Sequence, residues 1–221
     1  MDFGPLLLSF EVATIATLFA AVIGIAIAAL LANYRFPGRD LLDVISTAPM
    51  VMPPTVLGYY VIAVLGRSTP IGRAYFALTG GTIVFTFAGA VVAATIGAFP
   101  LVVKSVRAAL EQTDPTLMLA ARTLGATKLR AFFTVQIPLA ARGIVAALML
   151  AFARAVGEFG ITLMVAGDIP GRTRTASLAI YSLVEGQRNR EATTMVVVLT
   201  VLVLGLLYAG GKLTAPRPEG R

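Results

Sequence analysis

Five apolar runs, each near the length of a membrane-spanning helix, constrain the fold of this chain more than any other feature. A helix needs about 20 mostly apolar residues to cross the hydrocarbon core of a bilayer. The sequence therefore predicts an all-α fold, a polytopic membrane helical bundle of about five transmembrane helices, organised as one domain over residues 1–221. The runs cover residues 12–32, 44–66, 82–103, 143–167 and 193–211.

The composition agrees with a membrane protein and excludes several other classes. Hydrophobic residues make up 57% of the chain and charged residues only 13%, whereas a soluble domain carries about 25% charged residues. Cysteine and histidine are both absent, which removes disulfides, thiolate nucleophiles, imidazole bases and the usual zinc sites. No basic patch is interleaved with aromatic residues, so no nucleic acid partner is expected, and no cofactor is expected either.

The distribution of lysine and arginine predicts the orientation of the bundle. The first run begins near Met1 without a basic segment or a cleavage site, so it is interpreted as a retained helix. Basic residues concentrate in the cytoplasmic loops of membrane proteins, and here eleven fall on one side and six on the other. The N-terminus is therefore predicted outside and the C-terminus inside. The richer side holds Arg35, Arg39, Lys104, Arg107, Arg122, Lys128, Arg130, Arg142, Lys212, Arg217 and Arg221.

The outer loop of residues 168–191 is itself basic. It could form a vestibule that attracts an anion, or its arginines could be solvated and paired with Glu185 and Glu191. The sequence leaves both interpretations open.

Residues 112–138, between the third and fourth runs, carry local signals for two short cytoplasmic helices. Asp114 before Pro115 is typical of a helix N-terminus, Gly125 of a C-terminal cap, and Thr127 of the next N-cap. We expect Pro138 to limit the second helix. The small residues Ala120 and Ala121 would leave a flat surface, which is either a plain connection or a docking site for another protein.

This segment resembles the cytoplasmic signature of the inner-membrane permeases of binding-protein-dependent ABC importers. That signature is a Glu-Ala-Ala triplet, three residues, Gly, nine residues, and then Ile, any residue, Leu and Pro. Ala120, Ala121, Gly125 and Pro138 match it, while Leu119 occupies the position of the glutamate. The resemblance implies that residues 112–138 form the coupling loop, which docks on an ATPase subunit.

Two further stretches are similar to molybdate/tungstate permeases and, less closely, to sulfate permeases. They are MVMPPTVLGYY from Met50 and ARAVGEFGITLMVAGDIPGRT from Ala153, the latter followed by LAIY. The resemblance implies a subunit of the cell inner membrane in an ATP-driven importer of a tetrahedral oxyanion, most closely molybdate or tungstate. It also implies a permease homodimer, two ATPase subunits and a periplasmic oxyanion-binding protein as partners.

The chain lacks a nucleotide-binding motif of its own. A Walker A motif needs Gly, four residues, then Gly-Lys-Ser/Thr, and the nearest candidate, Gly211-Lys212-Leu213 with Gly205, fails in spacing and in its last residue. The sequence therefore predicts that this chain is not an enzyme and that ATP is hydrolysed by a partner.

The proline pair Pro53 and Pro54 interrupts the second run. Each proline removes a backbone donor, which membrane helices tolerate where neighbouring groups satisfy the freed carbonyls. We expect a bend there that either lines the pathway, forms a gate or is a packing kink.

Arg154 and Glu158 are charged residues within the fourth run, and charge at membrane depth is expensive. Their spacing of four favours an ion pair, with either a structural role or a role at a gate. With Gly157 and Gly160 of the GEFG stretch and the proline pair, they are the candidate translocation and gate residues. A carrier driven by an ion gradient remains an alternative, as does a permease for sulfate or another anion.

Overall fold

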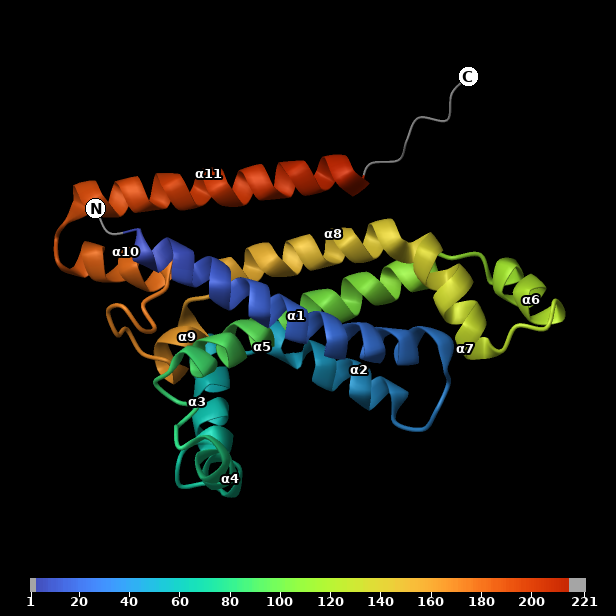
Figure 1. The fold of residues 1–221 in the computed structure, drawn as a ribbon, viewed down its shortest axis with the longest axis horizontal. Coiled ribbons are helices and arrows are strands. Elements are labelled where there is room, and N and C mark those ends of the chain that lie inside the picture. The colour runs from blue at the N-terminus through green and yellow to red at the C-terminus, as the bar shows by residue number, and fades with distance from the viewer. Residues whose placement is uncertain (1–2, 215–221) are drawn as a thin grey trace.

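The computed structural model describes residues 3–214 as an all-helical chain (Figure 1). Within that range, four helical stretches are long and apolar enough to cross a membrane. A fifth candidate span is a bent pair of helices, so the prediction of a bundle with about five spans is confirmed. Arg217 and Arg221, which entered the orientation argument, lie outside the described residues. The four stretches are α1 (Gly4–Asn33), α5 (Phe87–Glu111), the helix Lys128–Val156 and α11 (Asn189–Thr214).

Shorter helices connect the long ones and gather at the two ends of the bundle. Figure 1 places α6 and α7 at one end, and α9 and α10 at the other. The long stretch Lys128–Val156 is made of α7 (Lys128–Ala131), the π-helical turn η2 (Phe132–Gln136) and α8 (Ile137–Val156). The shorter elements are α2 (Arg39–Thr47), the 3-10 turn η1 (Ala48–Met50), α3 (Pro54–Leu65), α4 (Pro70–Thr79), α6 (Pro115–Thr123), α9 (Gly160–Val165) and α10 (Ala176–Glu185).

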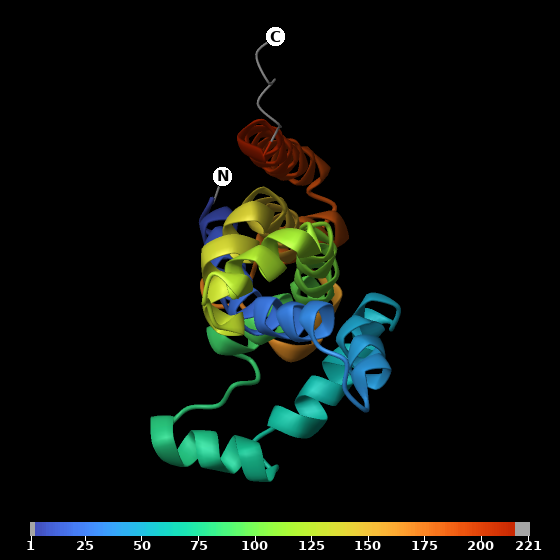
Figure 2. The ribbon, with the colours of Figure 1, turned by 90° about the vertical axis from the view of Figure 1, so that its right-hand side faces the viewer.

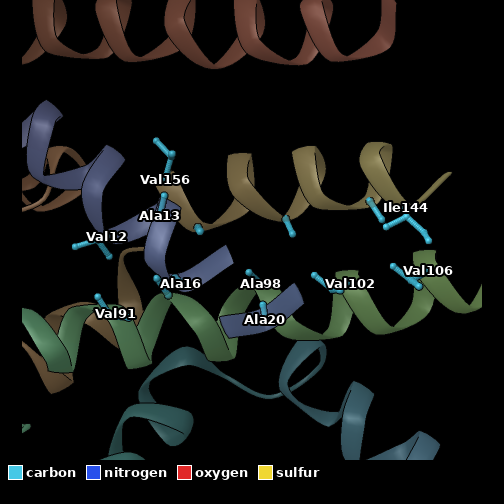
Figure 3. Packing of buried hydrophobic residues seen from close by; sticks show 14 of the residues in the cluster. Val12, Ala13, Ala16, Ala20, Val91, Ala98, Val102, Val106, Ile144 and Val156 are labelled. Carbon is cyan, nitrogen blue, oxygen red and sulfur yellow. The ribbon is translucent and has the colours of Figure 1, made fainter. Parts of the chain in front are cut away.

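The core lies where α1, α5 and α8 pack along one another, and alanine dominates it (Figure 3). Small residues let membrane helices approach closely. A Cβ added at Gly24 of α1 would lie 2.8 Å from Cγ1 of Val102 in α5. Gly24 therefore lets α1 lie close to α5. The buried alanines of the core are Ala13, Ala16, Ala20, Ala28, Ala90, Ala94, Ala98, Ala140, Ala147, Ala151, Ala155 and Ala166.

Helix α5 extends two turns beyond the apolar run from which it was predicted. The run ends at residue 103, but the helix continues to Glu111. Lys104 and Arg107, which sequence analysis assigned to a loop, both form ion pairs with Asp43 of α2. The hydropathy of the sequence ends the predicted span too early, because it treats Lys104 and Arg107 as unpaired charges and takes no account of Asp43.

The fourth apolar run is not a single helix, which corrects its predicted bounds of 143–167. The helix ends at Val156, Gly157 forms its C-cap, and the chain restarts as the short helix α9 at Gly160. On the other side the helical path reaches back to Lys128. The span therefore lies earlier in the chain, and the charged residue Glu158 lies in the break and not inside the helix.

Pro138 does not end a helix, contrary to the expectation from sequence. It lies in the first turn of α8, and the helical path from Lys128 continues through it. The π-helical turn η2 precedes it, with Ile137 N bonded to the carbonyl of Phe132, five residues back. A proline inside a regular helix lacks a donor and clashes with the carbonyl four residues earlier. The wider turn removes that conflict.

The second run bends at the proline pair, as predicted. The axes of Arg39–Met50 and Pro54–Leu65 differ by 112°. Pro53 has an extended backbone (ψ 134°) and Pro54 opens α3, where a proline needs no helical donor. Figure 2 shows that α4 projects away from the bundle, whereas α3 packs Leu57 and Val61 against α9. The second run is therefore a bent pair of helices, with α2 against α5 and α3 against α9.

Candidate functional site

The α6–α7 turn has the local structure that its sequence predicts. Asp114 Oδ1 accepts a hydrogen bond from Thr116 N at 2.8 Å, and Thr127 Oγ1 accepts one from Arg130 N at 3.2 Å. The hydrogen bond from Thr116 N holds the pKa of Asp114 below its usual value. Gly125 has a φ of 90°, a conformation open to glycine and costly for other residues. These caps fix the geometry of the turn without help from the rest of the bundle.

The turn presents an apolar surface that no residue of the described chain covers. Ala120 is exposed, Ala121 is half-buried, and no atom lies within 4 Å of a Cβ built at Gly125. Leu119 and Leu124 are 57% and 89% exposed. Sequence reasoning singled out the alanines and missed Leu124, although a leucine directly before a cap glycine is itself a signal. Pro138 lies apart from this turn, in α8.

Ion pairs join α2 and α5 at the end that carries the α6–α7 turn, and a hydrogen bond adds α1. Asp43 of α2 contacts Lys104 and Arg107 of α5, both at 2.9 Å. Arg107 also contacts Glu111 at 2.8 Å. Arg39 donates to the carbonyl of Leu31 at the end of α1 at 2.9 Å. We call Arg39, Asp43, Lys104, Arg107 and Glu111 the Asp43 cluster. Because α6 begins only four residues after the end of α5, the cluster connects the α6–α7 turn to α2.

Arg154 and Glu158 form the ion pair that their spacing predicts, at 2.6 Å. The Glu158 side chain is 2% exposed and that of Arg154 is 41% exposed. Glu158 also accepts a hydrogen bond from Ile161 N at 2.9 Å through its other oxygen. The carboxylate therefore links the end of α8 to the start of α9, and both of its oxygens are engaged.

Two helix breaks and the middle of α5 meet around this pair. A Cβ added at Gly160 would lie 2.5 Å from Cβ of Pro54, so the start of α9 touches the start of α3. A Cβ added at Gly97 of α5 would lie 2.7 Å from Glu158 Oε2. We call Pro54, Gly97, Arg154, Glu158 and Gly160 the helix junction. Gly97 was missed by sequence reasoning, because a glycine within an apolar run carries no signal of its partner.

Two of the predicted gate residues lie beside the junction and do not make its contacts. Pro53 precedes α3 as its N-cap. Gly157 caps α8 with a φ of −86°, and the atoms nearest to a Cβ built there are backbone carbonyls of its own helix at 3.7 and 3.8 Å. The structure therefore brings Pro54, Arg154, Glu158 and Gly160 together, while Gly157 has room for a methyl group.

The contact between Gly160 and Pro54 leads to a testable prediction. Gly160→Ala should push α3 away from α9, because overpacking of this kind costs about 1–3 kcal/mol. We expect a lower melting temperature of the purified protein. Gly205→Ala in α11 is the matched control, since a Cβ there meets nothing within 4 Å. Equal behaviour of the two variants in a thermal-shift assay would contradict the packing argument.

Comparison with known proteins places these features in a family. The profile described as "Binding-protein-dependent transport system inner membrane component" matches residues 20–212. The chain belongs to this family. It is thus a subunit of the inner membrane that works with a binding protein and an ATPase. Permeases of the family are not enzymes, because ATP hydrolysis takes place on the separate ATPase subunit.

Individual relatives cover nearly the whole chain. The molybdenum transport system permease protein ModB of Escherichia coli K12 is 42% identical over 210 residues, 94% of this chain and 92% of ModB. The sulfate transport system permease protein CysT of Salmonella typhimurium is 32% identical over 89% of this chain and 71% of CysT. Among solved structures, the MetNI methionine ABC transporter in inward-facing conformations matches with a TM-score of 0.74 at 22% identity, covering 95% of this chain and 93% of the other. That structure supports the fold alone.

Proposed function

We propose that this chain is the permease subunit of an ATP-driven importer of a tetrahedral oxyanion, with molybdate or tungstate as the substrate. The single observation that carries the proposal is the 42% identity to a molybdenum permease over 94% of the chain. In the proposed complex two copies of the chain form a homodimer, bind two ATPase subunits, and receive the anion from a periplasmic oxyanion-binding protein. Residues 1–221 act as one transmembrane permease domain.

The coupling loop of residues 112–138 is the proposed ATPase dock. Support comes from the exposed apolar turn around Ala120, Ala121 and Gly125, which Leu119 and Leu124 extend. Burial of such a surface against a partner is favourable, whereas an exposed Leu124 in water gains nothing. Pro138 lies in the first turn of α8, directly after η2. At this point the helical path from the dock continues into the α8 span.

The helix junction is the proposed gate of the pathway, and the Asp43 cluster connects it to the dock. A movement of the dock would be passed to α5, then through the cluster to α2, whose other end leads to the turn at Pro53 and Pro54. Pro54 contacts α9 through Gly160. In this mechanism nucleotide-driven movement at one end of the bundle displaces α3 from α9 at the junction.

Arg154 is proposed to position the gate and not to bind the anion for long. Its guanidinium is 2.6 Å from Glu158, so much of its charge is compensated. A free arginine in a water-poor site would hold a divalent anion strongly, and import requires release as well as capture. Arg154 therefore places a positive charge beside the pathway, and the carboxylate of Glu158 weakens the attraction of that charge for an anion.

The proposed substrate is tested by reconstituting the permease with its ATPase and binding protein in liposomes. ATP-driven uptake of molybdate is expected, with competition by tungstate and much weaker competition by sulfate. Omission of the binding protein should abolish uptake. Preferred uptake of sulfate would assign the chain to the function of its CysT relatives, and uptake driven by an ion gradient without ATP would reject the proposal.

The proposed orientation is tested with single cysteines, for which the chain has no native background. Leu78 and Gln187 are exposed at positions predicted outside, and Leu124 is exposed at the predicted dock. A membrane-impermeant maleimide added to intact cells should label Leu78→Cys and Gln187→Cys, and should reach Leu124→Cys only after the membrane is opened. Labelling of Leu124→Cys in intact cells would reverse the orientation.

A further inference from the structure

A cavity of about 650 Å³ opens at the dock end of the bundle, between the ends of α1 and α5 and the helices α6 and α7. Its volume is within the range of about 300–1,000 Å³ that small-molecule sites occupy. The cavity is separate from the helix junction and shares no residue with it. Its walls join the membrane bundle to the docking helices, so whatever fills it touches both.

One wall of the cavity is apolar and lies within a spanning helix. Ala26, Ala29 and Leu30 of α1 face the cavity, together with Phe132 of η2. Ala26 is seven residues before the end of α1 at Asn33, which is about 10 Å at the rise of an α-helix. This apolar wall therefore belongs to the candidate membrane span α1, along which an acyl chain can lie.

The mouth of the cavity is cationic. Arg122 of α6 and Lys128 of α7 line it, and neither forms a salt bridge with any carboxylate among residues 3–214. The Lys128 ammonium lies 5.9 Å from the ring centre of Tyr34. Glu111 also lines the cavity, but Arg107 at 2.8 Å and Arg39 at 3.9 Å compensate its charge. The net field at the mouth therefore favours an anion.

A buried hydrogen-bond acceptor lies in the same cavity wall. Gln136 is 5% exposed, and its Nε2 donates to the carbonyl of Leu110 at 3.2 Å. Its Oε1 has no hydrogen-bond partner in the described part of the chain. The accessible surface of Oε1 is below 1 Å², so Gln136 closes this wall of the cavity and its oxygen is not open to a ligand.

We propose that the cavity binds an anionic phospholipid. The phosphate would lie between Arg122 and Lys128, and an acyl chain would lie along Ala26 and Leu30. Basic pockets between membrane helices on the cytoplasmic side are known to bind anionic headgroups. A segment of the ATPase does not fit the apolar wall inside the span, and free phosphate would leave that wall uncovered.

The lipid would hold the docking helices at a fixed distance from α1. The transport activity of the complex should therefore depend on anionic lipid. The step that requires the lipid is the transfer of movement from the ATPase to the helical bundle. This inference goes beyond the proposed function, and because it is tested by lipid binding, its outcome does not depend on which anion is transported.

The test uses the permease purified with its ATPase and stripped of lipid in detergent. Native mass spectrometry measures the binding of added phosphatidylglycerol and of phosphatidylcholine with the same acyl chains. We expect phosphatidylglycerol to bind more tightly. Lys128→Gln should weaken it about fivefold, the ratio that a loss of about 1 kcal/mol per basic residue gives. Ala26→Phe, which fills the apolar wall, should also weaken it.

Two matched controls lie outside the cavity. Lys212→Gln removes a lysine that likewise lies over a tyrosine, 4.9 Å from the ring of Tyr208, and Leu7→Phe enlarges an exposed residue at the other end of α1. Both should bind phosphatidylglycerol as the natural chain does. Equal binding of the two lipids, or equal weakening by Lys212→Gln, would overturn the proposal. Full competition by inorganic phosphate would assign the site to a soluble anion and overturn it as well.

Discussion

Arg154→Ala should prevent most of the permease from assembling with its ATPase. The substitution leaves the carboxylate of Glu158, 2% exposed, without its charge partner. Breaking a buried pair from one side costs roughly 3–5 kcal/mol. We expect the lower end of that range, about 3 kcal/mol, because the Arg154 side chain is itself 41% exposed. Co-purification of the ATPase and the melting temperature of the complex measure the loss.

The double variant Arg154→Ala with Glu158→Gln should recover much of the assembly. It removes both charges, and the amide oxygen of glutamine can still accept the hydrogen bond from Ile161 N that Glu158 accepts at 2.9 Å. Recovery of assembly without recovery of uptake would show that the charges act in passage of the anion. A double variant that assembles as poorly as Arg154→Ala would refute the pairing argument.

The exposed ion pair between Arg188 and Glu191 provides the control for the junction pair. Its side chains are 61% and 37% exposed, and surface pairs contribute about 0–1 kcal/mol. Arg188→Ala should leave assembly unchanged. The difference between the two arginine variants therefore measures the effect of burying Glu158, and not the effect of losing an arginine.

Gly125→Val should abolish docking of the ATPase while the permease still inserts in the membrane. Gly125 has a φ of 90° and its Cβ position is empty, so the substitution causes strain without a clash. A non-glycine residue held in a left-handed conformation costs on the order of 1–3 kcal/mol, and more for a β-branched one. Because about 1.4 kcal/mol is tenfold in affinity, co-purification of the ATPase should fall about tenfold or more.

Two variants separate strain at the dock from strain elsewhere. Gly125→Asn should retain more docking than Gly125→Val, since asparagine tolerates the left-handed region. Gly38→Val introduces the same strain at a φ of 89°, also with nothing within 4 Å of the Cβ, but in the loop before α2. It should leave the ATPase bound. If Gly38→Val and Gly125→Val lose the ATPase equally, the α6–α7 turn is not the specific dock.

Local chemistry made parts of the structure predictable from sequence alone. Asp114, Gly125 and Thr127 act through backbone groups two or three residues away, so their roles can be read without the fold. The bend at Pro53 and Pro54 follows from two missing donors. The pairing of Arg154 with Glu158 follows from their spacing. Each of these signals lies within a few residues of its effect.

The features that sequence analysis missed depend on distant partners. Lys104 and Arg107 remain in a helix because the carboxylate of Asp43, about 60 positions earlier, accepts a hydrogen bond from each of them. Gly97 is required to be small by Glu158, which lies in the break between α8 and α9. Hydropathy also passed over the end of α8, since the run stays mostly apolar on both sides of Gly157 despite Arg154 and Glu158. The π-helical turn that admits Pro138 has no sequence signature that distinguishes it from a helix end.

The alanine core of α1, α5 and α8 determines what kind of motion these helices can make. Alanine has no side-chain rotamers to lose or exchange, so its methyl groups meet along a shallow surface in place of the deep interlocking that leucine or phenylalanine would give. A helix can be displaced along such a surface by small shear steps without a side chain having to leave its well. The three helices can therefore shift along one another in small steps. The Asp43 cluster at one end and the Arg154–Glu158 pair at the other limit the size of these shifts.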